Sequence, residues 1–280
     1  MSNTKGEAIK LDWTGFLLFS LSLVGLTLGL DLLGESEHNK MLTYSSLAIG
    51  IILLLGYGFY AHNNEKAILP LSLFRTRTFN LGIIAHTFIR LSSSGVPFLL
   101  PLMFQLSFGY SAEMSGWLLA PIALMSVIFK TLIGRILNRL GYKTTLLLSS
   151  ILMAGSVISM AWIEQQTSLV WVVLNLMWYG ACMSMIFTAV NTLAVGDLSP
   201  EQAGAGSTML SIVQQLGIGF GIAVSSIILT MYRQYFGNEG EALQQAFSYT
   251  FLTSTIFAIL LVWTVLKLHN TDGDHLRKKV

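Results

Sequence analysis

Apolar runs long enough to cross a lipid bilayer recur along this chain, and they constrain its fold more than any other feature. A helix needs roughly 20 apolar residues to span the hydrocarbon core of a bilayer. Eight runs have about that length: residues 13–33, 41–61, 79–106, 114–133, 144–163, 169–195, 207–232 and 247–267. Because they are far longer than the roughly 10 residues of a membrane-barrel strand and do not alternate in polarity, they predict about eight transmembrane α-helices.

The composition excludes several other classes of protein. Charged residues make up only 11% of the chain and hydrophobic residues 53%, whereas a soluble domain carries roughly 25% charged residues. The sequence therefore predicts an all-α integral membrane protein whose first partner is the lipid bilayer. The formal net charge of +2 argues against a nucleic-acid partner, since phosphate binding needs a concentrated basic face.

Signatures of catalysis and of bound metals are absent from the sequence. The one cysteine, Cys182, cannot form a disulfide or a thiolate metal site within one chain. The chain has no Gly-x-Ser-x-Gly elbow and no Gly-x-x-x-x-Gly-Lys phosphate loop. We therefore predict no enzyme, no catalytic residue, no metal site and no bound cofactor.

Lysine and arginine residues gather at one side of the predicted helices. If the N-terminus lies in the cytoplasm, the outer loops hold only Lys40 and Arg233. The inner segments hold Lys5, Lys10, Lys66, Arg75, Arg77, Arg135, Arg139, Lys143, Lys267, Arg277, Lys278 and Lys279. By the positive-inside rule, this asymmetry predicts a multi-pass protein with both termini in the cytoplasm.

The spacing of the runs divides the chain into three parts. Residues 1–78 are predicted to form a cytoplasmic N-terminal segment, a two-helix hairpin and a cytoplasmic linker. Residues 79–269 hold six helices with short connections, which we expect to form one six-helix bundle. Residues 270–280 are a polar cytoplasmic tail, and we expect it to be disordered.

A short basic segment, residues 134–143, connects the fourth and fifth runs. Gly134 and Gly141 near its ends predict a tight cytoplasmic turn, because glycine permits a sharp reversal and a close approach of helices. Arg139 and Lys143 could then pair with helix C-termini or with acidic groups when a bundle moves. An ordinary positive-inside loop would have the same residues, and physical reasoning alone gives the two interpretations about equal weight.

The same segment resembles the loop motif of the major facilitator superfamily, Gly-x-Leu-x-Asp-Arg-x-Gly-Arg/Lys. Gly134, Arg139, Gly141 and Lys143 match this motif, whereas Asn138 stands where the family usually has aspartate. Family members use that charge in a cytoplasmic gating contact. The departure at Asn138 therefore counts against a working gate in this copy of the loop.

Other stretches narrow the resemblance. Residues 73–79, 90–103 and 214–216 closely resemble the fourteen-helix drug:proton antiporter family, and most of all its MdtD/HsrA type. The resemblance implies that the chain corresponds to that family's two extra central helices and second six-helix bundle, with no counterpart of the first six helices. It also implies export of small amphipathic compounds across a bacterial cytoplasmic (inner) membrane, driven by a proton gradient.

Polar residues inside the runs are candidates for the substrate path. Arg90 lies near the middle of the third run, where a charge costs at least about 2.5 kcal/mol. We predict that it faces the bundle interior or a wet cavity and lines the path; a structural pairing with backbone carbonyls or Gln105 is the alternative. Gln105, Gln214, Gln215 and Asn191 are further candidates, although only one of the two adjacent glutamines can face a cavity squarely.

Three other features of the runs carry structural predictions. Pro97 and Pro101 should bend the third helix, because each removes a backbone donor. Gly217 and Gly221 make a small-xxx-small face that should let two helices pack closely. Lys130 falls near the end of the fourth run, and we expect its side chain to extend to the lipid headgroups.

Acidic residues are nearly absent from the runs. Only Asp31 lies within one, near its outer end, whereas proton-coupled transport usually relies on an intramembrane carboxylate. One hypothesis is therefore a transporter of a small-molecule substrate that lacks its first bundle, is inactive alone, and needs a separate N-terminal half or a second copy. The alternative is a non-transporting membrane scaffold or regulatory subunit derived from a transporter half.

Overall fold

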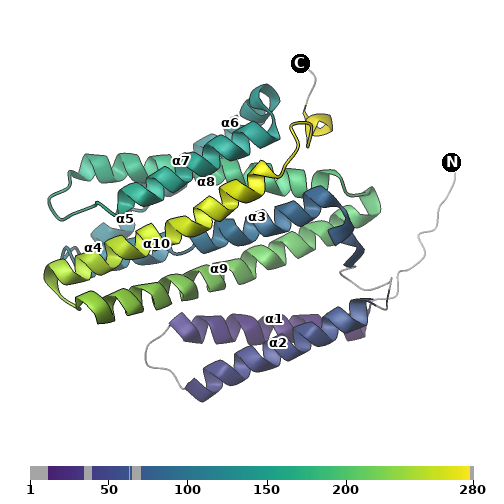
Figure 1. Cartoon of the computed structure of the whole chain (residues 1–280), viewed down its shortest axis with the longest axis horizontal. Helices are drawn as coiled ribbons and strands as arrows, with labels where there is room; N and C mark the ends of the chain where they lie inside the picture. Colours follow the sequence, from purple (N-terminus) through teal and green to yellow (C-terminus); the bar gives the residue numbers. More distant parts are fainter. Residues whose placement is uncertain (1–11, 35–39, 63, 65–70, 278–280) are drawn as a thin grey trace.

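The protein folds into long helices that run side by side (Figure 1). The computed structural model describes residues 12–34, 40–62, 64 and 71–277. Its elements are α1 (Trp13–Gly34), α2 (Lys40–His62), η1 (Leu71–Arg75), α3 (Arg77–Ser93), α4 (Val96–Leu106), α5 (Ala112–Trp117), α6 (Ala120–Leu140), α7 (Tyr142–Met160), α8 (Leu169–Gly196), α9 (Pro200–Phe236), α10 (Gly240–Leu266) and η2 (Asp274–Leu276). The N-terminal segment to residue 11, most of the predicted linker and the side chain of Asp31 lie outside the described residues.

Eight spans within the described residues are long and apolar enough to cross a membrane, which confirms the predicted fold class. Two of them consist of two helices each: α3 and α4 make the span Arg77–Leu106, and α5 and α6 make the span Ala112–Leu140. Large apolar side chains cover the outside of the protein, for example Phe59 at 77% exposed and Val127 at 66%. A bilayer solvates such a surface, whereas water would not.

The third span breaks just before Pro97 instead of bending at it. α3 ends at Ser93 and α4 begins at Val96, so Pro97 lies in the first turn of α4. A proline there loses no helical hydrogen bond, since the first N–H groups of a helix have no partner within it. Pro101 lies inside α4. A second break, which the sequence did not predict, separates α5 from α6, again with a proline in the first turn, Pro121.

The predicted turn at residues 134–143 is helical for most of its length. α6 runs to the residue before Gly141, so Gly134, Asn138 and Arg139 lie in a helix, and the prediction of a loop that starts at Gly134 is wrong. The physical reason is that buried apolar side chains, such as Leu137, continue past Gly134 and hold this end of α6 on the core. Gly141 alone separates α6 from α7, with a φ of +78° that favours glycine.

The main apolar core lies between α3, α7, α8 and α10. Glycines let its helices approach: a Cβ at Gly82 would meet Ala194 across the α3–α8 contact, and one at Gly180 would meet the backbone of Ile122 across the α6–α8 contact. Glycines also allow α9 to approach α3 closely, where Gly217 and Gly221 face Arg90. The close packing predicted for these last two glycines is therefore confirmed.

The hairpin of α1 and α2 lies along α9, on the side away from α6 and α7 (Figure 1). Gly25 and Gly50 lie against each other where α1 crosses α2, and Gly219 of α9 faces Leu30 of α1. At the end where α2 finishes, Tyr57 joins an apolar cluster that also contains residues of η1, α3, α8 and α9. The hairpin thus contacts the six-helix part along α9 and at the end of α2.

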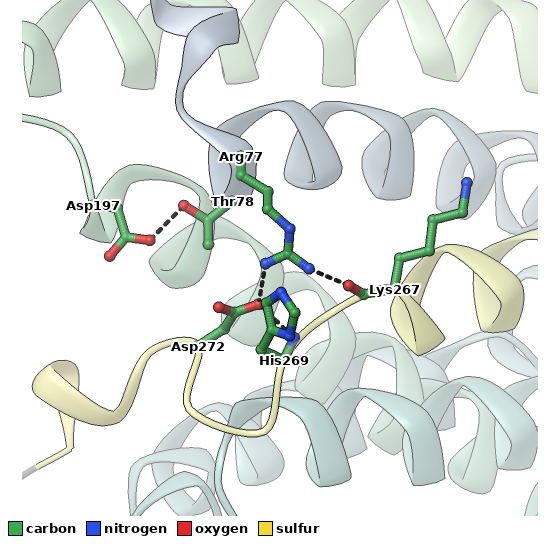
Figure 2. Close-up of polar contacts among 6 residues, drawn as sticks. All are labelled: Arg77, Thr78, Asp197, Lys267, His269 and Asp272. Carbon is green, nitrogen blue, oxygen red and sulfur yellow. Dashed lines mark hydrogen bonds and ion pairs between the residues drawn. The ribbon is translucent and has the colours of Figure 1, made fainter.

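The polar tail packs on the bundle from residue 267 to residue 277, which differs from the predicted disorder. Figure 2 shows Arg77 of α3 donating hydrogen bonds to Asp272 Oδ2, at 2.9 Å, and to the carbonyl of Lys267. Asp272 Oδ2 also accepts from the backbone N–H of His269 at 2.7 Å. We call this end of the bundle the tail face. Composition alone suggests a solvated tail, because it cannot show that Arg77 lies within reach of Asp272.

The tail also reaches α6 and α8. Arg277 donates to the carbonyl of Asn138 at 2.6 Å, which caps the last turn of α6. Leu276 packs against Gly196 at the end of α8, and His275 Nε2 lies 3.3 Å from Asp197 Oδ1. The tail therefore bridges the ends of α3, α6, α8 and α10.

Replacing Arg77 with glutamine should loosen the tail. The Arg77 side chain is 43% exposed, so its ion pair contributes about 1 kcal/mol or less, and the fold should survive. We expect trypsin to cleave after Lys267 severalfold faster in Arg77→Gln than in the unmodified protein, as measured by mass spectrometry. Arg75→Gln is the matched control, since exposed Arg75 forms no ion pair in the described structure. Equal cleavage in both variants would contradict the role given to Arg77.

Candidate substrate-binding groove

Two adjoining cavities open along one side of the six-helix part. The larger, about 590 Å³, is lined by residues of α3, α4, α6, α8 and α9, including Arg90, Ser94, Pro97, Phe98, Ile122, Ser126, Tyr179, Met183, Ser184, Phe187, Ile218 and Ile222. The smaller, about 400 Å³, lies between α6 and α8 and includes Lys130, Thr188, Asn191 and Thr192. Because both are lined by Ser126, Ser184 and Phe187, we treat them as one groove. α7 and α10, on the other side of the core, contribute no residue to its lining.

Arg90 is the charged centre of the larger cavity. It lies near the middle of the span Arg77–Leu106, and its Cζ is 4.3 Å from the centroid of the Phe187 ring. Its Nε is buried and has no hydrogen-bond partner in the described structure. Gly217 makes room for the side chain, since a Cβ there would lie 2.8 Å from Arg90 Cβ and Cγ. The guanidinium is therefore held over an aromatic face with donors still unused.

A polar cluster links the three helices beside Arg90. His86 of α3 is fully buried, and its Nε2 lies 3.0 Å from Asn191 Oδ1 of α8. Gln214 of α9 donates to the same oxygen at 2.8 Å. An amide oxygen only accepts hydrogen bonds, so Nε2 of His86 carries the proton. His86 lies one helical turn before Arg90, and its ring is 5.6 Å from that of Phe187.

Three of the lining hydroxyls are already engaged in helix packing. Ser126 donates to the carbonyl of Gly180 at 3.1 Å, and Ser184 donates to the carbonyl of Ser126 at 2.7 Å. Tyr179 donates to the carbonyl of Ser93 at 3.0 Å. These bonds hold α6, α8 and α3 together, whereas the hydroxyls of Ser93 and Ser94, which also line the larger cavity, have no hydrogen-bond partner in the described structure.

The break between α3 and α4 lies at the groove, so that Arg90 before the break and Pro97 after it both line the larger cavity. A model of the Major Facilitator Superfamily matches residues 11–222. The chain belongs to the major facilitator superfamily. It is 74% identical over 278 residues to HsrA of Haemophilus influenzae, which is named as a transport protein; this covers 99% of the chain and 60% of that relative.

More distant relatives agree on the family. The chain is 30% identical over 261 residues to MdtD of Pectobacterium atrosepticum, named for multidrug resistance, which covers 93% of this chain and 56% of MdtD. A crystal structure of the nucleoside transporter NupG superposes with a TM-score of 0.54 at 17% identity, over 91% of this chain and 65% of NupG. At that identity, the likeness concerns the fold alone. The chain thus spans about 60% of the length of its curated relatives.

Two of the five path candidates predicted from the sequence, Arg90 and Asn191, line the groove, and a third, Gln214, lies behind the lining, hydrogen-bonded to Asn191. Asn191 and Gln214 join α8 to α9 one helical turn from Arg90 on α3, through the hydrogen bond from His86 to Asn191. Gln105 is exposed near the end of α4, and Gln215 is exposed on α9; neither lines either cavity. The sequence-based alternative that pairs Arg90 with Gln105 is therefore wrong, because the 15 residues between them correspond to about 22 Å of helix.

The remaining predicted residues divide between the groove and the tail face. Pro97 lines the groove, whereas Pro101 does not. Lys130, whose side chain the sequence predicts to extend to the headgroups, is exposed and lines the smaller cavity. The superfamily motif residues Gly134, Asn138, Arg139, Gly141 and Lys143 lie toward the tail face and line neither cavity.

Sequence reasoning missed His86 and Phe187 as members of the site. Both had a signal: His86 lies four residues before Arg90, and Phe187 lies four residues before Asn191, so each pair shares a helix face. Within the described residues, no group of three or more histidine, cysteine, aspartate or glutamate side chains could hold a metal ion. The groove itself offers a guanidinium, an aromatic ring and an amide, from Arg90, Phe187 and Asn191, and these groups suit the binding of an organic molecule.

Proposed function

We propose that this chain forms one wall of the substrate path of a membrane transporter for small amphipathic compounds. The observation that carries the proposal is the position of Arg90, half-buried in mid-span, in the larger cavity of the groove, which has a volume of about 590 Å³ and an apolar aromatic lining. A charge at that depth costs at least about 2.5 kcal/mol, and transporters place such groups along substrate or ion pathways. The names of HsrA and MdtD support the same class of function.

The second wall would come from another membrane bundle. Transporters of this kind rock one bundle against another around a site near the bilayer midplane, and here one bundle lines the whole groove. None of the groove's lining residues is acidic, so a proton-coupling carboxylate would also come from the other bundle. We therefore propose that the chain is inactive alone and works with a separate N-terminal half or a second copy.

The finer assignments follow from the resemblance and the charge pattern. We propose export from a bacterial cytoplasm across the inner membrane, by proton antiport, with the tail face in the cytoplasm. The tail face contains Arg77, Arg139, Lys143 and Arg277, which is the distribution that the positive-inside rule expects. A non-transporting scaffold is the second candidate, and Asn138 favours it because the motif's acidic residue is absent.

A reconstitution experiment tests transport. The chain is produced alone, and together with the N-terminal portion of H. influenzae HsrA that it does not cover, in a bacterial strain lacking its main efflux pumps. We expect uncoupler-sensitive export of a fluorescent dye only from the pair, and a loss of at least tenfold in rate with Arg90→Ala at equal membrane levels. Export by the chain alone would overturn the need for a second bundle. A stable pair that exports nothing would support the scaffold.

A further inference from the structure

We propose that the substrate is a small amphipathic anion whose acidic group binds between Arg90 and Lys130. This inference rests on the proposed function and names the substrate class of the same groove. Arg90 lines the larger cavity and Lys130 the smaller one, and the Phe187 ring is part of both. Each cavity therefore contributes one cation, and the two cavities share the Phe187 side chain.

Arg90 has unused capacity to bind an anion. Its guanidinium lies over the face of Phe187 and has no carboxylate partner among the described residues. A guanidinium presents five N–H donors in a planar fork that matches a carboxylate, sulfonate or phosphate. Stacking on an aromatic ring leaves the edge of that fork free. The side chain is therefore ordered but incompletely bonded, which suits it to recognition.

Lys130 adds a second positive charge on the same surface. It lies four residues after Ser126 on α6, and this spacing is about 6 Å along the helix. Its ammonium makes no hydrogen bond or ion pair in the described structure. It lines the cavity together with Phe187 and Asn191, so an acidic group near Phe187 could approach both cations.

The remaining lining fixes the rest of the ligand. No aspartate or glutamate is among the residues that line the two cavities, so nothing there neutralises the cations or attracts a cationic compound. Phe98, Ile218 and Ile222 supply an apolar surface. The hydroxyls of Ser126 and Ser184 donate hydrogen bonds to helix carbonyls. The lining thus matches a compound with a hydrophobic body and one strong acid, and it disfavours a cation.

The test compares two naphthylamine probes of the same ring skeleton. The purified full chain in a zwitterionic lipid nanodisc is titrated with 8-anilinonaphthalene-1-sulfonate and with uncharged N-phenyl-1-naphthylamine, and fluorescence gives the Kd. We expect the sulfonate to bind at least tenfold more tightly than the neutral probe, after subtraction of empty nanodiscs. Removing one charged hydrogen-bonding group typically weakens binding by about tenfold or more. We therefore expect that loss for Arg90→Gln and about threefold to tenfold for Lys130→Gln.

Two further variants keep the result interpretable. Arg90→Lys retains the charge but loses the planar fork, so its Kd for the sulfonate should fall between those of the unmodified protein and Arg90→Gln, which separates lost charge from lost folding. Lys143→Gln removes a cation outside the groove and should change nothing. Equal binding of the two probes, or unchanged sulfonate binding in both Arg90→Gln and Lys130→Gln, would overturn the proposal.

The reconstituted pair separates this inference from the proposed function. Tight sulfonate binding by the chain together with no export from the pair would overturn transport and leave anion binding standing. Export of a cationic dye that is insensitive to Arg90→Gln would overturn the anion assignment and leave transport standing. If a carboxylate of the second bundle occupies Arg90 instead, the pair will bind the sulfonate no better than the neutral probe, which also counts against the proposal.

Discussion

Replacing Gly221 with alanine should destabilise the protein by about 1–3 kcal/mol, whereas the same change at Gly134 should stabilise it by about 0.5–1 kcal/mol. A Cβ at Gly221 would meet the Arg90 carbonyl oxygen and lie 2.8 Å from Ser94 Cβ. A backbone carbonyl cannot rotate away, so α9 would have to move off α3. A Cβ at Gly134 meets nothing within 4 Å, and only the gain in helix propensity remains.

The pair is informative because both glycines lie inside helices, so the intrinsic effect of the substitution is nearly the same. Cys182 supplies the measurement: it is the one cysteine and is 1% exposed, so a thiol-reactive fluorophore reports unfolding during a thermal ramp in detergent. We expect the melting temperature to fall by several degrees in Gly221→Ala and to rise slightly in Gly134→Ala. A fall of equal size in both would show that Gly134 is needed for a close contact, as the sequence first suggested.

Hydropathy was enough to predict the eight spans, because lipid imposes length and apolarity on every helix that crosses it. It could not predict where helices end beyond the hydrocarbon region. α6 continues to Leu140 and α9 extends over Pro200–Phe236, although the apolar runs suggested ends near 133 and 232. Outside the bilayer core, a polar residue fits a helix as well as a loop, so hydropathy no longer distinguishes the two.

Arg90 was visible in the sequence because a charge within an apolar run is costly and therefore informative. Its surroundings were not visible. Phe187 looks like any lipid-facing aromatic residue until the fold places it under the guanidinium. Leu276 likewise looks like one apolar residue in a polar tail, and only the fold shows that it packs against Gly196. Contacts of this kind depend on which helices are neighbours, which periodicity does not specify.

Replacing Asn191 with leucine should cost about 1–3 kcal/mol, although the two side chains have the same number of heavy atoms and the same branch at Cγ. Asn191 Oδ1 accepts hydrogen bonds from His86 Nε2 at 3.0 Å and from Gln214 at 2.8 Å. His86 is fully buried, so the loss of its acceptor leaves a donor that water cannot reach. Gln214→Leu should cost less, about 0.5–1.5 kcal/mol, because Asn191 would still accept from His86.

The double variant His86→Leu with Asn191→Leu tests whether the cost of Asn191→Leu comes from the His86 donor that it leaves without an acceptor. Removing both partners of a buried hydrogen bond is far less costly than removing one, since no unsatisfied group is left behind. In the Cys182 labelling assay, we therefore expect the double variant to melt at a higher temperature than the sum of the two single-variant shifts predicts. Additive shifts, by contrast, would mean that His86 and Asn191 do not depend on each other. The link of α3 to α8 beside Arg90 would then rest on apolar packing alone.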